Sequence, residues 1–156
     1  GVNGGLVDVR LPPSTTPVGD HTTSLMDPSR ELVYVTAFHP EKQVLFGYVF
    51  SREEYPWTQL WEHYPSEGAI ARGLEFATQP FDLPGREVIQ TNTLLGAPTY
   101  RWLPAKSTIT SGFLMFYTRT PEGMRQIDDV RLEGGRLTIE DRSSGQTITL
   151  AAWPGL

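Results

Sequence analysis

The chain has 156 residues and a mass of 17.4 kDa, the size of one ordinary domain that can bury a core without disulfides or a structural metal. The formal net charge of -5 and the scattered positions of the 13 Lys and Arg residues leave no basic field for a phosphate backbone, which excludes nucleic acid as an expected partner. No apolar run approaches the roughly 18 residues of a membrane-spanning helix, so no membrane partner is expected, and no cysteine is present to form a disulfide or a thiol nucleophile.

Residues 1–30 are predicted to form an extended N-terminal arm. They contain two Pro-rich patches, "LPPSTTP" and "DPSR", and few large apolar residues. One short strand is expected near Leu6 to Arg10. The arm is expected to wrap around residues 31–156, which form the domain.

From Glu31 onward, β-branched and aromatic runs separated by turn residues predict strands. The runs "ELVYVTAF" and "QVLFGYVF" flank the turn "HPEK" and predict a hairpin. Further strands are expected at 57–64, 70–77, 86–91 and 107–118, and an alternating pattern with turns at 134–135 and 143–145 predicts a C-terminal meander. Because 15 glycines and 13 prolines interrupt every helical stripe, the predicted fold class is an all-β antiparallel sandwich.

The sequence carries no motif for a metal, a cofactor or a nucleophile. The three histidines, His21, His39 and His63, show no His-x-His or His-x-x-x-His spacing, so no metal site is predicted. There is no Gly-x-Ser-x-Gly elbow, and no glycine-rich loop precedes a predicted helix. We therefore expect no cofactor.

Residues 53–76 are the richest part of the chain in aromatic and ionisable side chains together. A pyranose ring presents an apolar C–H face that stacks on Trp or Tyr, and a hydroxyl rim that binds carboxylates, amides and guanidinium groups. This composition favours a sugar site, and the alternative is that Trp57 and Trp61, four residues apart, simply fill the core. The candidate sugar-binding residues of this stretch are Tyr55, Trp57, Trp61, Glu62 and Arg72.

Glu75 places a carboxylate inside the apolar run "RGLEFA". Strand alternation puts Leu74 and Phe76 on the face opposite Glu75, while the small residues Gly73 and Ala77 share its face and leave room for a ligand. A carboxylate desolvated beside an arginine or a tyrosine can act as a general base. The alternative is that Glu75 is solvated on the outer face of the sheet.

The stretch from about Val35 to Glu122 resembles the C-terminal part of the aldose 1-epimerase (galactose mutarotase-like) superfamily. The matching pieces are "TAFHPEKQVLFGYVFSREEYPW", "WEHY", "RGLEFATQPFDLPGRE", "GAPTYRWLPAKSTITSGFLMFY" and "TPEG". That superfamily folds as a large twisted antiparallel sandwich of about twice this length. The resemblance therefore implies a half-length or compact version of the galactose mutarotase-like supersandwich.

The resemblance also implies a role for Glu75 as the base that takes the proton from the anomeric hydroxyl of a sugar. Glu75 matches the glutamate of the family's "LE-x-Q-x-x-P"-like strand, and Gln79 and Pro80 follow it with the spacing shifted by one or two residues. The histidine acid of those enzymes belongs to an earlier half that this chain does not match. His63 or His21 is the candidate acid here.

Three functions remain open at this stage. The first is a carbohydrate-binding β-sandwich, in which residues 55–64 stack on a sugar or oligosaccharide while side chains including Glu62, Arg72, Glu75 and Gln79 hold its hydroxyls. The second is an aldose 1-epimerase-type isomerase, and the third is a non-catalytic structural or interaction domain of a longer protein. Because a severed half would expose sheet edges, either a missing N-terminal half or a homodimer is the expected protein partner.

Overall fold

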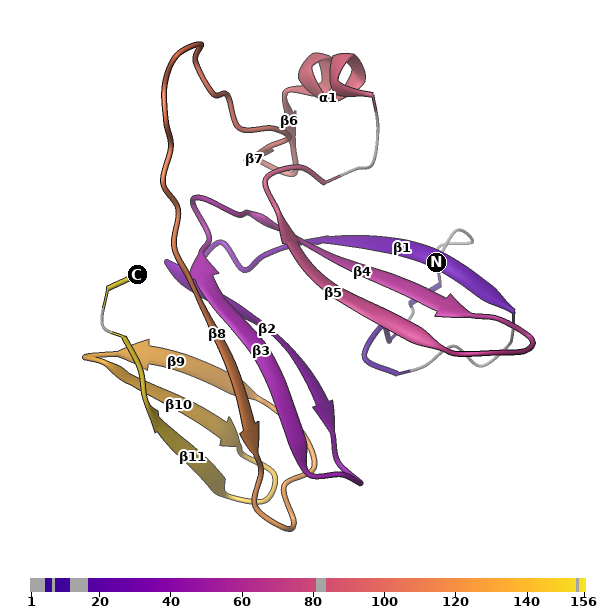
Figure 1. Cartoon of the computed structure of the whole chain (residues 1–156), viewed down its shortest axis with the longest axis vertical. Coiled ribbons are helices and arrows are strands. Elements are labelled where there is room, and N and C mark those ends of the chain that lie inside the picture. The colour runs from indigo at the N-terminus through magenta and orange to yellow at the C-terminus, as the bar shows by residue number, and fades with distance from the viewer. Residues whose placement is uncertain (1–4, 7, 12–16, 81–83, 154) are drawn as a thin grey trace.

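The computed structural model describes residues 5–6, 8–11, 17–80, 84–153 and 155–156, and these form an antiparallel, all-β fold with one short helix (Figure 1). In chain order the elements are β1 (Val18–Leu25), β2 (Leu32–His39), β3 (Val44–Ser51), β4 (Trp57–Tyr64), β5 (Ala71–Ala77), α1 (Gly85–Thr91), β6 (Thr93–Leu94), β7 (Ala97–Pro98), β8 (Phe113–Arg119), β9 (Asp129–Glu133), β10 (Arg136–Asp141) and β11 (Gln146–Ala151).

The longer strands form three small antiparallel sheets of three strands each. We call them the N-terminal sheet (order β1-β4-β5), the central sheet (order β2-β3-β8) and the C-terminal sheet (order β11-β10-β9). The short strands β6 and β7 pair with each other and lie beside α1 at one end of the molecule (Figure 1). Within the described ranges, no helix is long and apolar enough to cross a membrane.

The main core lies between the central and the C-terminal sheets. Leu45 and Val49 of β3 project from one face of the central sheet and pack with Phe116 of β8. The C-terminal sheet covers this face with Leu137 and Ile139 of β10, both essentially inaccessible to solvent. The prediction of an all-β antiparallel fold is therefore confirmed, whereas the galactose mutarotase-like supersandwich stays a prediction.

The opposite face of the central sheet packs against the N-terminal sheet. Val33, Val35 and Phe50 are buried on this face, and Leu74 and Phe76 of β5 pack against them. Since side chains alternate along a strand, the face of the N-terminal sheet that carries Leu74 and Phe76 is the inner face, and its other face points away from the central sheet.

Gly47 allows the closest approach within the central sheet. It pairs with Phe116, and a Cβ at this position would lie 2.6 Å from Phe116 Cζ and 2.8 Å from the carbonyl oxygen of Val35. The phenyl ring of Phe116 therefore occupies the space that any side chain at position 47 would need.

The turn between β10 and β11 is organised by Asp141, which is fully buried. Its carboxylate accepts hydrogen bonds from the hydroxyl and the backbone N–H of Ser143 and from the backbone N–H groups of Arg125 and Ser144. These bonds, above all the one from the Ser143 hydroxyl, hold the pKa of Asp141 well below its usual range. The C-terminal meander and its two turns are as predicted from the sequence.

One predicted strand is wrong, and another is right only in its second half. Residues 86–91 lie in the helix α1. The carbonyl of Pro84 accepts the N–H groups of Glu87 and Val88, and Glu87 places a negative charge in the first turn, which outweighs the strand preference of Val88 and Ile89. The strand expected at 107–118 begins only at Phe113, and the exposed residues before it are extended without a pairing partner among the described residues.

The N-terminal arm also differs from its prediction. Leu6 and residues 8–11 contain no strand, and the N–H of Leu11 donates to the carbonyl of Asp8 to close a turn, while Val7 lies outside the described residues. The strand of this region is β1, which pairs over its whole length with β4. Most of the patch "LPPSTTP" also lies outside the described residues.

Gly47→Ala is expected to lower the free energy of unfolding by about 1–3 kcal/mol, because the added methyl group overlaps both Phe116 and the backbone of β2. Urea denaturation of the purified chain measures this change. Gly19→Ala on β1 is the matched control, since a Cβ there meets nothing within 4 Å. Equal stability of the two variants would contradict the packing described here.

Candidate functional site

The outer face of the N-terminal sheet carries Glu75 and several of the other predicted site residues. Strand register sets Glu75 beside Gln59 of β4, and it sets Trp61 between Gly73 of β5 and His21 of β1. Residues directly paired across antiparallel strands share a face, so these side chains all project away from the central sheet. Sequence analysis thus correctly placed Glu75 opposite Leu74 and Phe76.

Trp61 and Glu75 meet above Gly73. The indole of Trp61 is exposed, with 42% of the residue accessible to solvent. A Cβ at Gly73 would lie 3.1 Å from Glu75 Oε1 and 3.5 Å from Trp61 Cε3, so the carboxylate and the indole edge flank the same small space. The absence of a side chain at position 73 keeps this space open.

Two imidazoles border the same area. His21 Nε2 lies 3.9 Å from Glu75 Oε2, and the two groups form an ion pair whenever His21 is protonated. The imidazole of His63 lies parallel to the indole of Trp61, with ring centroids 5.8 Å apart and an angle of 3° between the planes. The open half of the outer face therefore combines a flat aromatic surface, a carboxylate and two groups that can donate or accept a proton.

The other half of the outer face is covered by the chain that follows β5. The side-chain amide of Gln59 donates to the carbonyl of Gln79 at 3.0 Å, and the hydroxyl of Thr23 donates to the carbonyl of Pro80. At the first residue of β4, Trp57 Nε1 donates to the carbonyl of Pro98 at 2.7 Å. Glu75 is the strand partner of Gln59. It therefore lies at the boundary between the open half of the outer face and the half that the backbone at Gln79 and Pro80 covers.

Glu62 and Arg72 occupy the inner face of the same sheet, and a ligand on the outer face cannot contact them together with Glu75. Arg72 Nη2 lies 3.1 Å from Glu62 Oε1, and Arg72 also donates to the carbonyls of Val9 and Arg10. The Glu62 oxygen is buried and accepts no hydrogen bond of good geometry from the described residues. This pair ties the N-terminal arm to the sheet.

Tyr55 and Trp57 are packing residues. The ring centroid of Tyr55 lies 5.0 Å from that of Phe76 and 6.1 Å from that of Phe50, between the central and N-terminal sheets. Trp57 is 1% exposed. Trp57 is thus buried beneath the segment at Pro98, outside the two hydrophobic clusters that join the sheets, whereas Trp61 is exposed.

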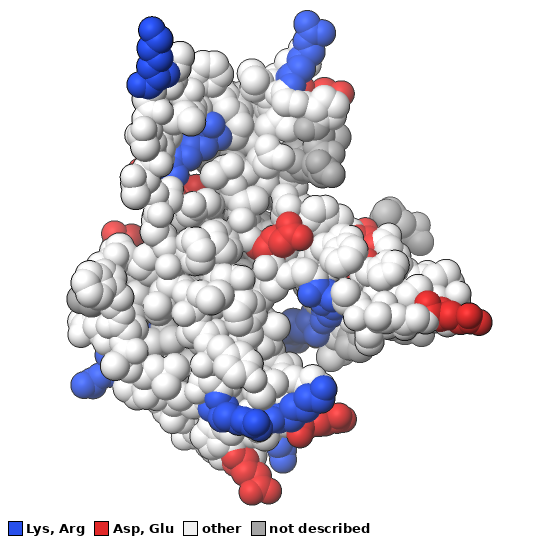
Figure 2. Space-filling model, in the orientation of Figure 1, with Lys and Arg blue, Asp and Glu red and all other residues white. Residues whose placement is uncertain are grey.

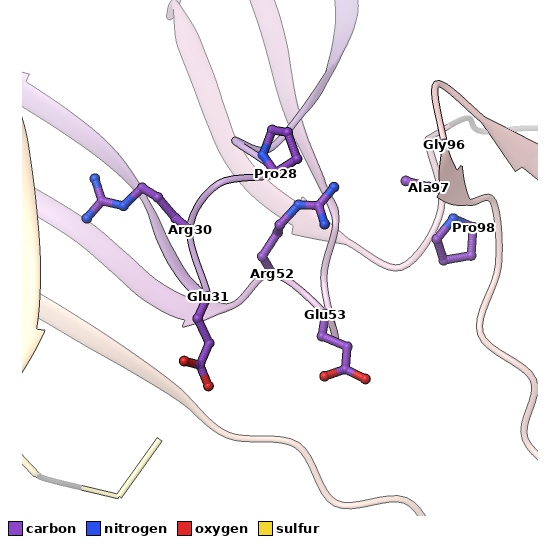
Figure 3. Close-up of a pocket in the computed structure, with 8 residues that line it drawn as sticks. All are labelled: Pro28, Arg30, Glu31, Arg52, Glu53, Gly96, Ala97 and Pro98. Atoms are coloured by element: carbon purple, nitrogen blue, oxygen red, sulfur yellow. The ribbon is translucent and has the colours of Figure 1, made fainter.

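Two open cavities lie elsewhere on the molecule, and neither is lined by Glu75. The first, of about 420 Å³, lies between Arg52 and the segment at Pro98, and the carboxylates of Glu31 and Glu53 point away from the Arg52 guanidinium (Figure 3). A second cavity of about 330 Å³ shares Glu53 and Pro98 with it and is also lined by Tyr100. Glu75, whose side chain is 48% exposed, lines neither of these two cavities.

Charge and metal-ligand geometry set further limits on the chemistry of the surface. Basic and acidic side chains are interspersed on the face shown in Figure 2, with no broad area of one sign. Across the part of the chain that the structure describes, no three His, Asp or Glu side chains are grouped so that they could hold a metal ion.

No family model, curated protein or solved structure matches the chain. The relationship to the aldose 1-epimerase superfamily rests on the sequence motifs from Val35 to Glu122 and stays a proposal.

Arg72→Ala is expected to lower the free energy of unfolding by about 1–3 kcal/mol, because it leaves the buried Glu62 carboxylate without its cation. Urea denaturation measures this loss, and the double variant Glu62→Gln/Arg72→Ala is expected to recover part of it. A loss of ligand binding at unchanged stability would instead place Arg72 in the binding site.

Proposed function

We propose that the chain is a carbohydrate-binding β-protein of the galactose mutarotase-like type, and that the sugar lies on Trp61 beside Glu75. The observation that supports this most strongly is the convergence of an exposed indole and a carboxylate over Gly73. The indole offers a flat apolar surface to a pyranose ring, and the adjacent carboxylate supplies the polar contact that a hydroxyl rim needs.

The expected binding mode follows from the two halves of the outer face. The apolar C–H face of a pyranose ring rests on the indole, while Glu75 accepts hydrogen bonds from two ring hydroxyls. His21 and His63 lie on the same face, where each ring nitrogen donates to or accepts from a further hydroxyl. The backbone at Gln79 and Pro80 limits the ligand on the side of Trp57.

An open surface with a single exposed indole predicts weak binding, with a Kd of about 1 mM or a free energy of about 4 kcal/mol. Such affinity is compatible with recognition of a polymer, because several weak sites acting together bind much more tightly than one. The proposal therefore includes oligosaccharides as well as monosaccharides.

Calorimetric titration with a panel of mono- and oligosaccharides tests this proposal. Binding heat and a change in tryptophan fluorescence are expected with at least one sugar. Trp61→Ala is expected to weaken that binding at least tenfold through loss of stacking, and Glu75→Gln to weaken it several-fold through loss of charged hydrogen bonds.

Trp102→Ala is the matched control, because Trp102 is 68% exposed and lies in the loop before β8. Equal losses in the Trp61 and Trp102 variants, or no heat with any sugar, would contradict the proposal. The second of these outcomes would favour a structural or interaction domain.

A second candidate function is that of an aldose 1-epimerase-type isomerase, and the distance of 3.9 Å between His21 Nε2 and Glu75 Oε2 favours it. In ring opening, a base takes the proton of the anomeric hydroxyl, the bond from the anomeric carbon to the ring oxygen breaks, and an acid protonates the ring oxygen. Both oxygens are bonded to one carbon, so an acid and a base this close together can reach both. The short distance to Glu75 supports His21 as the proposed acid.

Polarimetry on freshly dissolved α-glucose or α-galactose separates the two functions. An isomerase is expected to accelerate mutarotation over buffer, and Glu75→Gln and His21→Ala are each expected to reduce the acceleration by about 100-fold or more. His39→Ala, at the exposed end of β2 on another sheet, is the control and is expected to leave the rate nearly unchanged. A rate equal to that of buffer would leave binding as the function.

A further inference from the structure

β8 forms an unprotected edge of the central sheet. It pairs with β3 on one side, and no described strand pairs with its other side. A free edge presents a row of unpaired N–H and C=O groups, and proteins usually protect such edges with charged residues or proline. From Phe113 to Thr118, β8 contains neither.

The side chains of β8 alternate between the core and the solvent. Leu114 and Phe116 face the C-terminal sheet and pack in the main core. The intervening residues are exposed, with accessible fractions of 50% for Phe113, 61% for Met115 and 68% for Tyr117. An apolar stripe therefore runs along the free edge on the side away from the main core.

This stripe continues an aromatic surface of the central sheet. The ring of Phe113 lies 5.9 Å from that of Tyr48 on β3 and 5.2 Å from that of Phe76 on β5, measured between centroids. Phe46 extends the surface, with its ring 4.9 Å from that of Tyr48. The exposed side chains of β8 thus form the border of a larger apolar face.

Two other edge strands expose smaller or more polar side chains than β8 does. The exposed positions of β11, at the edge of the C-terminal sheet, are Thr147, Thr149 and Ala151. β5, at the edge of the N-terminal sheet, carries Arg72 and Glu75. The combination of a free edge and large, exposed apolar side chains distinguishes β8 from both.

We propose that β8 pairs with β8 of a second copy of the chain, antiparallel about a two-fold axis, to give a continuous six-stranded central sheet. A two-fold axis near Phe116 sets Met115 opposite the partner's Tyr117, which makes a sulfur–aromatic contact. The same axis sets Phe113 opposite the partner's Arg119, whose guanidinium can lie over the phenyl ring.

The exposed apolar area along β8 is consistent with an interface to a second copy of the chain. At their observed exposure, Phe113, Met115 and Tyr117 present roughly 300–400 Å² per copy, about half of the ~800 Å² per partner that a stable interface buries. The strand backbone and the adjoining rings of Phe46 and Tyr48 supply further area. The pairing is self-complementary, because Met115 meets the partner's Tyr117 and Phe113 meets the partner's Arg119 on both sides of the axis. It does not rest on the proposed sugar site, which lies on the outer face of a different sheet.

Sedimentation velocity and light scattering over micromolar chain concentrations test the dimer. The wild-type chain is expected to show twice the 17.4 kDa of one chain as the concentration rises. Met115→Lys is expected to shift the protein to monomer by at least tenfold in dissociation constant, since it sets two charges at the new strand pair. Thr149→Lys, on the edge strand β11, is the matched control and is expected to leave the dimer intact.

A wild-type chain that is monomeric throughout, or a dimer equally stable in both lysine variants, would overturn the proposal. Met115→Cys provides a second measurement that does not depend on the fold surviving a charge, because the chain has no cysteine of its own. A short thiol-to-thiol crosslinker is expected to join two copies of Met115→Cys and not of Thr149→Cys. Equal crosslinking of both would also overturn it.

Discussion

The packing of the central sheet on both faces is the constraint on which the other features of the molecule depend. β3 alternates between Leu45 and Val49 on one face and Tyr48 and Phe50 on the other, and the first pair packs against the C-terminal sheet. The face that carries Tyr48 and Phe50 is also apolar, and β5 of the N-terminal sheet packs against it. A slip of one residue in β5 would exchange its two faces and lose this contact, so the register is strongly specified.

This constraint also explains why Glu75 faces solvent. Leu74 and Phe76 are held against the central sheet, so the residue between them must point outward, where it meets Trp61 across Gly73. The chain after β5 then folds back and covers the outer face only as far as Gln59. The candidate site is the remaining open part, bordered by backbone on one side, and its exposed chemistry is that of an aromatic platform with one carboxylate and two imidazoles.

Local patterns predicted the strands well where β-branched and aromatic runs end at turn residues, as in 31–50 and 57–64, and where apolar and polar residues alternate, as in 130–150. They failed at 86–91, where β-branched residues concealed a short helix whose start at Pro84 was the better signal. The same alternation separates Glu62 from Trp61, so the two faces of β4 could have been distinguished from the sequence. His21 could not have been placed beside Glu75, because that contact depends on β1 crossing to β4, some 40 residues away, and no local pattern encodes the pairing.

Burial of individual side chains depended on the tertiary structure in the same way. Trp57 and Trp61 share a face, yet Trp57 donates its indole N–H to Pro98 and is enclosed, while Trp61 remains open. The most direct test of the account is an NMR titration of the indole N–H resonances with sugar. The account predicts that the Trp61 resonance shifts while that of Trp57 does not, and shifts confined to residues around Arg52 and Pro98 would contradict it.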